Sequence, residues 1–297
     1  MKFIDGAIEG KNDTIRYIVG FCLIIFTYFI GSTFLFLDIS LNYTSVITPE
    51  SESEIIQLVG KNRFLVLVLI PFLLVSILLF FISTKVHGRR FLLLFTGREK
   101  IDFKRILYSF TIIVLLQSLI LGFQVYFNPA IVWQFEFQKF LPLAVIAIIL
   151  IPIQTTCEEL LFRGYIMQGI KLRTKSNLIA IIMSGIMFGL VHIGNPEIEV
   201  IGYHIIIYYI AVGIFLGLIS FFDNGMELSI GYHAANNLFA ALIVTTNWQV
   251  FQTDALFIDK TPPSIGWDTI IGVLIILPLL FFLFKYKYKW INLNLRD

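Results

Sequence analysis

The chain has 297 residues, of which 58% are hydrophobic and only 14% are charged, and its mean hydropathy is +0.86. A soluble domain carries about 25% charged residues because its surface meets water, so this composition excludes an ordinary soluble protein. The net charge of +2 is too small to indicate a nucleic-acid-binding surface, and we expect no nucleic acid partner.

Apolar runs long enough to cross a bilayer follow one another along the whole chain. A transmembrane helix needs about 20 mostly apolar residues. In chain order we expect such helices at 17–37, 64–82, 106–126, 141–162, 178–193, 201–222, 228–246 and 267–284. The first run is too long for a signal-peptide core and lacks a small-residue cleavage site, so we interpret it as a retained anchor. The sequence therefore predicts an all-α, polytopic membrane protein with about eight transmembrane helices.

Basic residues are distributed unequally between the two ends of these helices. The two terminal tails and the connections 83–105 and 163–177 hold 18 of the 22 Lys and Arg residues, and the opposite end holds four. Lys and Arg concentrate on the cytoplasmic side of a membrane. We therefore expect both termini in the cytoplasm and the connections 38–63 (Asp38, Glu50, Glu52, Glu54) and 247–266 outside.

Ionisable side chains are costly inside a bilayer, yet several lie in the predicted helices of the second half. They are Glu158, Glu159 and Arg163 on the fourth helix, His192 at the end of the fifth and His233 on the seventh, accompanied by Asn236 and Asn237. Glu159 and Arg163 are four residues apart and share a helix face, whereas Glu158 lies about 140° around the axis from Arg163. We expect Glu159 to pair with Arg163 and Glu158 to face elsewhere.

The depths of these residues indicate where they meet. If helices four and five form a hairpin that turns near Lys175, Glu158 and His192 are each 17 residues from the turn and lie at the same height. His233 lies only about eight residues from the 223–227 turn, or roughly 12 Å. These depths agree only if the hairpin projects into the cytoplasm. We then expect the groups to meet in a cavity below the cytoplasmic surface.

Three segments carry a resemblance to a known family. Glu158-Glu159-Leu-Leu-Phe-Arg163, Phe188-Gly-Leu-Val-His192 and His233-Ala-Ala-Asn-Asn237 resemble the EExxxR, FxxxH and HxxxN motifs of the CPBP (Abi) intramembrane proteases. This family includes the Ras-converting CAAX endopeptidase. The resemblance covers about 140–245. We therefore divide the chain into about three N-terminal helices without a specific motif (1–130), a CPBP-like catalytic core (131–250), and an external loop, last helix and basic cytoplasmic tail (251–297).

The resemblance implies an intramembrane endopeptidase that cleaves a membrane-associated peptide or protein. It implies that Glu158 and His192 activate a water molecule, that His233 and Asn237 stabilise the oxyanion, and that Glu159 with Arg163 holds the helices. These residue types suit peptide hydrolysis, which needs a base and donors aimed at the developing oxyanion. The expected partners are the substrate and the lipid bilayer.

We expect no metal cofactor, although family members are often called metalloproteases. The alternative is a zinc site with ligands Glu158, His192 and His233. The sequence lacks HExxH, which supplies two His ligands and a separate Glu base. Zinc on these three residues would leave only Glu159 as a nearby acid, and Glu159 is expected to neutralise Arg163.

The sequence leaves other functions open. A non-catalytic scaffold, such as a bacteriocin-immunity protein, would keep its function without Glu158. A transporter would favour inverted repeats and broken helices in both halves, whereas the ionisable groups here lie in the second half. Glu158 could also be a proton-relay carboxylate, and Cys157 a thiol nucleophile. The bias toward Ile, Phe and Lys indicates a bacterial plasma membrane, but neither the substrate, its prenylation nor the oligomeric state is indicated.

Four further features are predicted to be structural or solvated. Gly185-x-x-x-Gly189 and Gly213-x-x-x-Gly217 are typical of close helix packing in membranes. His87 lies in the basic loop 83–105 and is expected to be solvated, and His204 is expected at the membrane interface.

The charge distribution makes a prediction about topology. Reporter fusions after residue 297 and within 83–105 should report a cytoplasmic location, and fusions within 38–63 or 247–266 an external one, because basic connections are retained in the cytoplasm. An external C-terminus would contradict both the helix count and the orientation.

Overall fold

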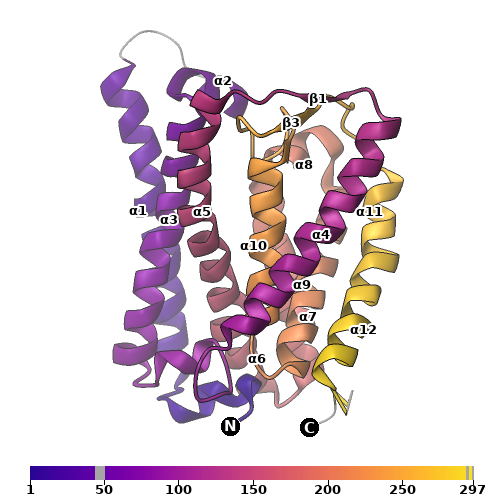
Figure 1. Ribbon diagram of the computed structural model, residues 1–297. Coiled ribbons are helices and arrows are strands. Elements are labelled where there is room, and N and C mark those ends of the chain that lie inside the picture. Colours follow the sequence, from indigo (N-terminus) through magenta and orange to yellow (C-terminus); the bar gives the residue numbers. More distant parts are fainter. Residues whose placement is uncertain (44–50, 292–293, 296–297) are drawn as a thin grey trace.

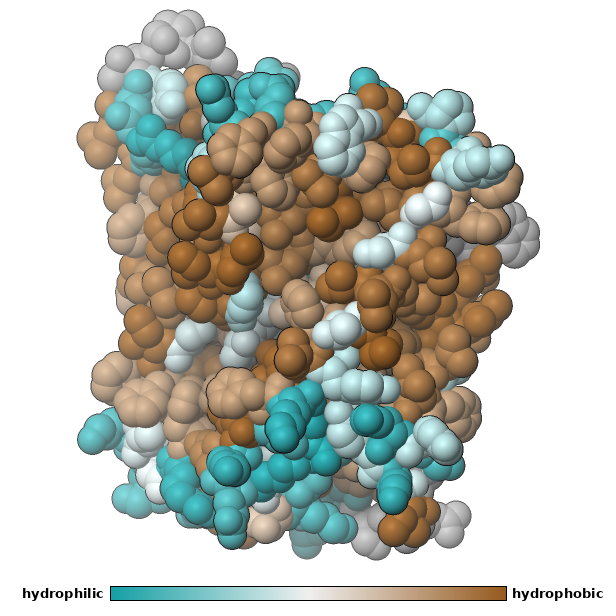
Figure 2. All heavy atoms as spheres, in the orientation of Figure 1, coloured by the Kyte–Doolittle hydropathy of each residue, from teal (hydrophilic) through white to brown (hydrophobic). Residues whose placement is uncertain are grey.

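A bundle of apolar helices makes up the structure, a computed structural model that describes residues 1–43, 51–291 and 294–295. Glu50 and the end of the basic tail lie outside the described residues. Within the described residues, seven helical segments are long and apolar enough to cross a membrane. Figure 2 shows a broad hydrophobic belt between two hydrophilic ends, and both termini lie at one of these ends in Figure 1. The predicted polytopic membrane protein is confirmed.

The eight predicted apolar runs each coincide with a helix or a series of joined helical segments. The long helices are α1 (Thr14–Asn42), α3 (Lys61–Phe81), α4 (Phe103–Phe127), α5 (Phe137–Glu159), α7 (Asn177–Leu190), α9 (Ile206–Phe222), α10 (Glu227–Leu242) and α12 (Leu277–Tyr288). Shorter helices are α2 (Glu52–Val59), α6 (Gln168–Thr174), α8 (Pro196–Ile201) and α11 (Trp267–Ile271). Short 3-10 or π segments are η1 (Phe3–Glu9), η2 (Ile82–Val86), η3 (Phe91–Leu94), η4 (Leu160–Met167), η5 (Val191–Gly194), η6 (Tyr203–Ile205) and η7 (Gly272–Ile276).

Helix α10 corresponds to the run predicted at 228–246, and it is not among the seven apolar segments. It has only 16 residues and includes Glu227, His233, Asn236 and Asn237. It packs against α4, α5 and α9 in the interior of the bundle, and most of its residues are buried. Its polar side chains therefore face protein rather than lipid, as a membrane interior requires.

A small sheet adds to the predicted all-α fold at the end of α10 that lies away from the termini (Figure 1). Strand β3 (Phe257–Asp259) lies between β1 (Ile131–Trp133) and β2 (Val244–Thr245). It pairs antiparallel with β1 and parallel with β2. Strands of two or three residues are too short to show alternating hydrophobicity, so they could not be predicted from the sequence.

The hairpin predicted near Lys175 is present. Helix α5 continues without a break through the π segment η4 into α6, which ends at Lys175 in the left-handed conformation with a φ of 57°. Ser176 then caps α7 by accepting a hydrogen bond from the Ile179 backbone N–H. The long 137–174 helix thereby runs the length of the bundle and carries the EExxxR motif at mid-length.

The glycine motifs bring α7 and α9 into backbone contact, as predicted. A Cβ atom on Gly213 would lie 2.6 Å from the carbonyl oxygen of Gly185. A Cβ atom on Gly189 would lie 2.8 Å from the backbone nitrogen of Ile210. Only glycine permits this approach, which is how small residues drive helix association in a bilayer.

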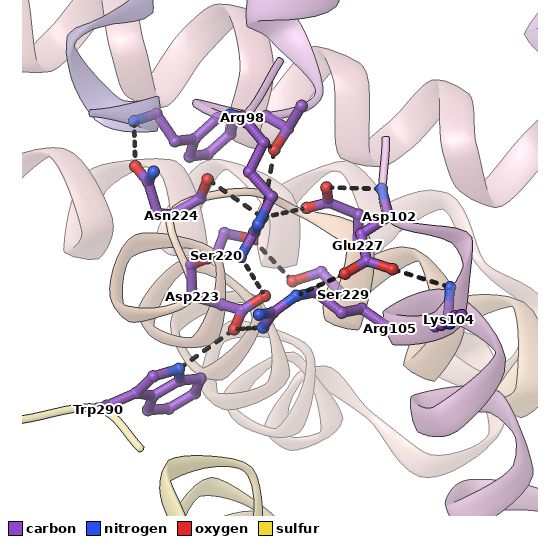
Figure 3. Close-up of polar contacts among 12 residues, drawn as sticks. Arg98, Asp102, Lys104, Arg105, Ser220, Asp223, Asn224, Glu227, Ser229 and Trp290 are labelled. Carbon is purple, nitrogen blue, oxygen red and sulfur yellow. Dashed lines mark hydrogen bonds and ion pairs between the residues drawn. The ribbon is translucent and has the colours of Figure 1, made fainter. Parts of the chain in front are cut away.

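The basic loop 83–105 is ordered and fixes the start of α10. Arg98 pairs with Asp223 and Glu227, at 3.2 and 3.0 Å, and Arg105 also pairs with Asp223. The Trp290 indole N–H donates to Asp223 at 3.1 Å. Figure 3 shows this cluster joining the loop, the turn between α9 and α10 and the C-terminal segment.

The prediction that His87 is solvated is wrong. His87 is fully buried, with Nδ1 2.8 Å from the carbonyl oxygen of Lys11 and Nε2 3.1 Å from the Tyr165 hydroxyl. Burial lowers the pKa of His87. The N-terminal segment covers the basic loop, so this histidine is part of a packed contact, whereas His204 is exposed.

Candidate active site

The acidic pair on α5 divides between two environments. The Gln154 side-chain amide, four residues before Glu158 on the same helix face, donates to Glu158 Oε1 at 2.6 Å. Glu159 is fully buried and points instead toward Arg163, whose Nε lies 3.3 Å from Glu159 Oε2. The two neighbouring carboxylates therefore have different surroundings, as the helix geometry predicted.

Arg163 is neutralised and held from several sides. Besides Glu159, its Nη2 donates to the carbonyl oxygen of Gly213 at 3.0 Å. Its guanidinium carbon lies 4.5 Å from the ring centre of Phe188, within the range of a cation–π interaction. Arg163 and Glu159 have no exposed side-chain surface, so this pair is part of the protein interior.

Glu159 has a second partner that sequence reasoning missed. His233 Nδ1 lies 2.9 Å from Glu159 Oε1. A carboxylate only accepts hydrogen bonds, so Nδ1 carries the proton and Nε2 is directed the other way. Nε2 lies 3.5 Å from Glu158 Oε2. Glu159 therefore orients the imidazole of His233, and Glu158 faces its Nε2 atom. The linear motifs could not reveal this arrangement.

His192 is oriented by the backbone and by an aromatic ring. Its Nδ1 lies 2.7 Å from the carbonyl oxygen of Phe188, one turn earlier on the same helix. Its ring stacks on Tyr209 of α9, with ring centres 4.3 Å apart. Because Nδ1 donates to a carbonyl, the Nε2 edge is available to a ligand as an acceptor.

Gln154 links Asn237 to Glu158 through two hydrogen bonds. The Asn237 side-chain amide donates to Gln154 Oε1 at 3.1 Å, while the amide of Gln154 donates to Glu158. Gln154 is 6% exposed. Its four-residue spacing from Glu158 was the sequence signal that could have identified it.

All four predicted catalytic residues line one cavity of about 430 Å³. Glu158, His192, His233 and Asn237 are among its lining residues, whereas Glu159 and Arg163 are not. Cys157, the alternative nucleophile, is 2% exposed and packs in the hydrophobic core. The cavity thus separates the groups expected to meet a substrate from those expected to hold the helices.

The cavity extends away from the termini, not toward them. From Glu158 and His233 its lining continues to Glu52 on α2, Glu197 on α8 and residues 249–251, at the end opposite the N- and C-termini (Figure 1). The expectation that the cavity lies below the surface on the side of the termini is therefore wrong. The space on the side of the termini is filled by fully buried core residues, including Met167, Leu216, Ile219 and Met226.

The alternative zinc site is supported by the residue types but not by their arrangement. Both histidines fix Nδ1 on an oxygen atom and leave Nε2 available, as metal-binding histidines usually do. Among the described residues, however, no three His, Cys, Asp or Glu side chains are gathered as a metal ion requires.

Comparison with known proteins identifies the region that holds this site. Residues 137–239 match the family model described as type II CAAX prenyl endopeptidase Rce1-like. This part of the chain is similar to that family. The match includes all three motifs, so the resemblance that they indicated is confirmed.

The likeness to a relative extends beyond the Rce1-like region. The chain is 28% identical over 253 residues to the uncharacterized protein YyaK of Bacillus subtilis (strain 168), an alignment that covers 82% of both proteins. No solved structure matches the chain. The alignment with this relative therefore extends well beyond residues 137–239.

The buried cluster in the Rce1-like region predicts a difference between the two glutamates. Glu159→Ala should lower the free energy of unfolding by about 3–5 kcal/mol, because it leaves Arg163 as an unpaired buried charge. Glu158→Gln should melt close to the wild-type temperature, since Gln still accepts a hydrogen bond from Gln154. Thermal unfolding of both purified variants in the same detergent measures the difference. Equal destabilisation would contradict the division of roles.

Proposed function

We propose that this chain is an intramembrane endopeptidase that hydrolyses a peptide bond of a membrane-associated peptide or protein. The observation that carries the proposal is the convergence of Glu158, His192, His233 and Asn237 on one cavity inside an Rce1-like region. The buried position of this cavity suits a bond that is cleaved within the membrane, where a water molecule must be held and activated.

In the proposed reaction, Glu158 is the base. Its Oε1 accepts from Gln154, whereas its Oε2 lacks a hydrogen-bond partner among the described residues and is buried. This oxygen lies 3.5 Å from His233 Nε2 and, in the proposed reaction, takes a proton from a water molecule held between it and His192 Nε2. The resulting hydroxide adds to the scissile carbonyl carbon, and the proton held by Glu158 passes to the leaving amine.

The oxyanion formed on the carbonyl needs donors. His233 Nε2 donates only when both ring nitrogens carry protons, and its positive charge then lies between Glu158 and Glu159. Asn237 supplies a side-chain amide that donates to Gln154 in this structure. In the proposed complex it turns one N–H toward the oxyanion, where such a donor contributes about 2.7–4 kcal/mol.

The proposal predicts which variants lose cleavage. Glu158→Gln and His192→Ala should abolish processing while the folded protein persists, because each removes a group that contacts the water. Quantitative mass spectrometry of protein termini should compare membranes from cells with the wild type and with each variant at matched levels. Cleavage sites in membrane-associated proteins should disappear in both variants. Identical profiles for wild type and Glu158→Gln would instead support a non-catalytic scaffold.

Two controls complete this test. Glu136→Gln removes an exposed carboxylate outside the cavity and should leave the cleavage profile unchanged. Treatment of the purified enzyme with a zinc chelator should also leave cleavage intact. Loss of activity that zinc alone restores would assign Glu158, His192 and His233 to a metal and overturn the proposed base.

A further inference from the structure

Two acidic side chains lie at the mouth of the cavity. Glu52 begins α2 and Glu197 lies on α8, and both line the same cavity as Glu158. The two helices are distant in the sequence, and both lie in the half of the bundle away from the termini (Figure 1). No part of the proposed hydrolysis uses either residue.

Glu197 is buried at this mouth and is held by hydrogen bonds. It is 4% exposed, and its Oε1 accepts hydrogen bonds from the Asn195 amide, at 3.0 Å, and from the Tyr209 hydroxyl. Its Oε2 is buried and has no hydrogen-bond partner among the described residues. Tyr209 also stacks on His192, so the group that fixes Glu197 contacts the candidate active site directly.

Glu52 also has a buried carboxylate oxygen, Oε1, without a hydrogen-bond partner in the described part of the chain. Burial is the main cause that raises the pKa of Glu52 to about 7, and the negative charges of Glu197 and Glu199 contribute in the same direction. A cation bound beside these two carboxyl groups would favour the ionised form of Glu52 and would face carboxylate oxygens that have no hydrogen-bond partner among the described residues.

Three basic side chains on neighbouring segments pair with other acids. Lys61 pairs with Asp254, Arg63 with Asp38, and Lys139 with Glu136. A buried carboxylate oxygen without a partner loses its hydration and gains nothing in return. A positively charged ligand would compensate for the lost hydration. Both carboxyl groups line the cavity in which such a ligand could bind.

Other parts of the cavity lining are apolar and aromatic. They include Phe64, Val68, Leu69, Phe72 and Tyr208. Such a wall suits an apolar chain, while the carboxylates suit a cation next to it. The two features together describe a segment with a positive charge followed by hydrophobic residues.

We propose that Glu52 and Glu197 form a subsite that binds a positively charged nitrogen of the substrate, supplied by a Lys or Arg side chain or by a free amino terminus. The inference rests on the proposed peptidase function and adds a substrate class to it. With the predicted topology, the mouth faces the outside, so the substrate's cation approaches from the external surface and its apolar segment extends toward Glu158.

The test measures binding of fluorescent peptides that share one apolar sequence. The full-length protein is held in nanodiscs made of lipids without net charge. One set has an acetylated amino terminus and a single lysine placed at successive positions. A second set replaces that lysine with acetyl-lysine, and a third combines acetyl-lysine with a free amino terminus. Binding is measured by fluorescence anisotropy in the Glu158→Gln background, which prevents turnover, with empty nanodiscs as the reference.

At least one lysine or free-terminus peptide should bind about tenfold tighter than its neutral counterpart, the scale of one partly buried ion pair. Adding Glu52→Gln or Glu197→Gln should abolish this preference, whereas adding Glu136→Gln should preserve it. Which charged set is preferred identifies the source of the nitrogen. Equal binding of charged and neutral peptides at every position, or a preference that survives in both mouth variants, would overturn the subsite.

Cleavage of the same peptides by the wild type separates this proposal from the proposed function. Charge-dependent binding that requires Glu52 and Glu197 without any cleavage would contradict the peptidase and support the subsite. Cleavage without a charge preference would contradict the subsite alone.

Discussion

A fully buried arginine is the constraint on which the rest of this bundle depends. An unpaired guanidinium in a membrane interior costs several kcal/mol, so every element around Arg163 contributes to its neutralisation. Glu159 supplies the countercharge, Gly213 on α9 a carbonyl oxygen, and Phe188 on α7 an aromatic face. Because Glu159 also binds His233 on α10, the arrangement fixes four helices relative to one another.

This constraint connects packing to chemistry. Arg163 reaches the backbone of Gly213 where α9 lies against the backbone of α7, so the glycines and the ion pair form one contact region. The same Glu159 that neutralises Arg163 directs the imidazole of His233 toward Glu158. The stability of the interior and the orientation of the candidate active site therefore share one carboxylate, which explains why two adjacent glutamates have separate roles.

Much of this arrangement follows from the sequence because its determinants are local. Apolar runs give the helices, four-residue spacing gives the Glu159–Arg163 pair, and the glycine spacing gives the contact between α7 and α9. The contact of Glu159 with His233 depends on α10, 74 residues further along the chain, and no local pattern encodes it. The π segment η4 likewise departs from the regular α-helix, whereas the angle of about 140° between Glu158 and Arg163 assumes 100° per residue.

The direction of the cavity could not be predicted for a related reason. Helix depth alone places Glu158 and His192 at one height but does not tell which half of the bundle is filled. Met167 and Leu216 fill the half near the termini, while the opposite half is bordered by Glu52 and Glu197. These two acids resemble ordinary loop charges in the sequence, and only their burial without partners distinguishes them.

The central claim is that a water molecule activated at Glu158, not a nucleophile of the enzyme, attacks the peptide bond. A single turnover in ¹⁸O-labelled water, with the enzyme in excess over a cleaved peptide, tests this directly. The account predicts that the new carboxyl terminus of the product contains ¹⁸O after the first turnover and that Glu158 does not. An unlabelled product with ¹⁸O in the Glu158 carboxylate would show that Glu158 forms a covalent acyl intermediate, and would contradict the account.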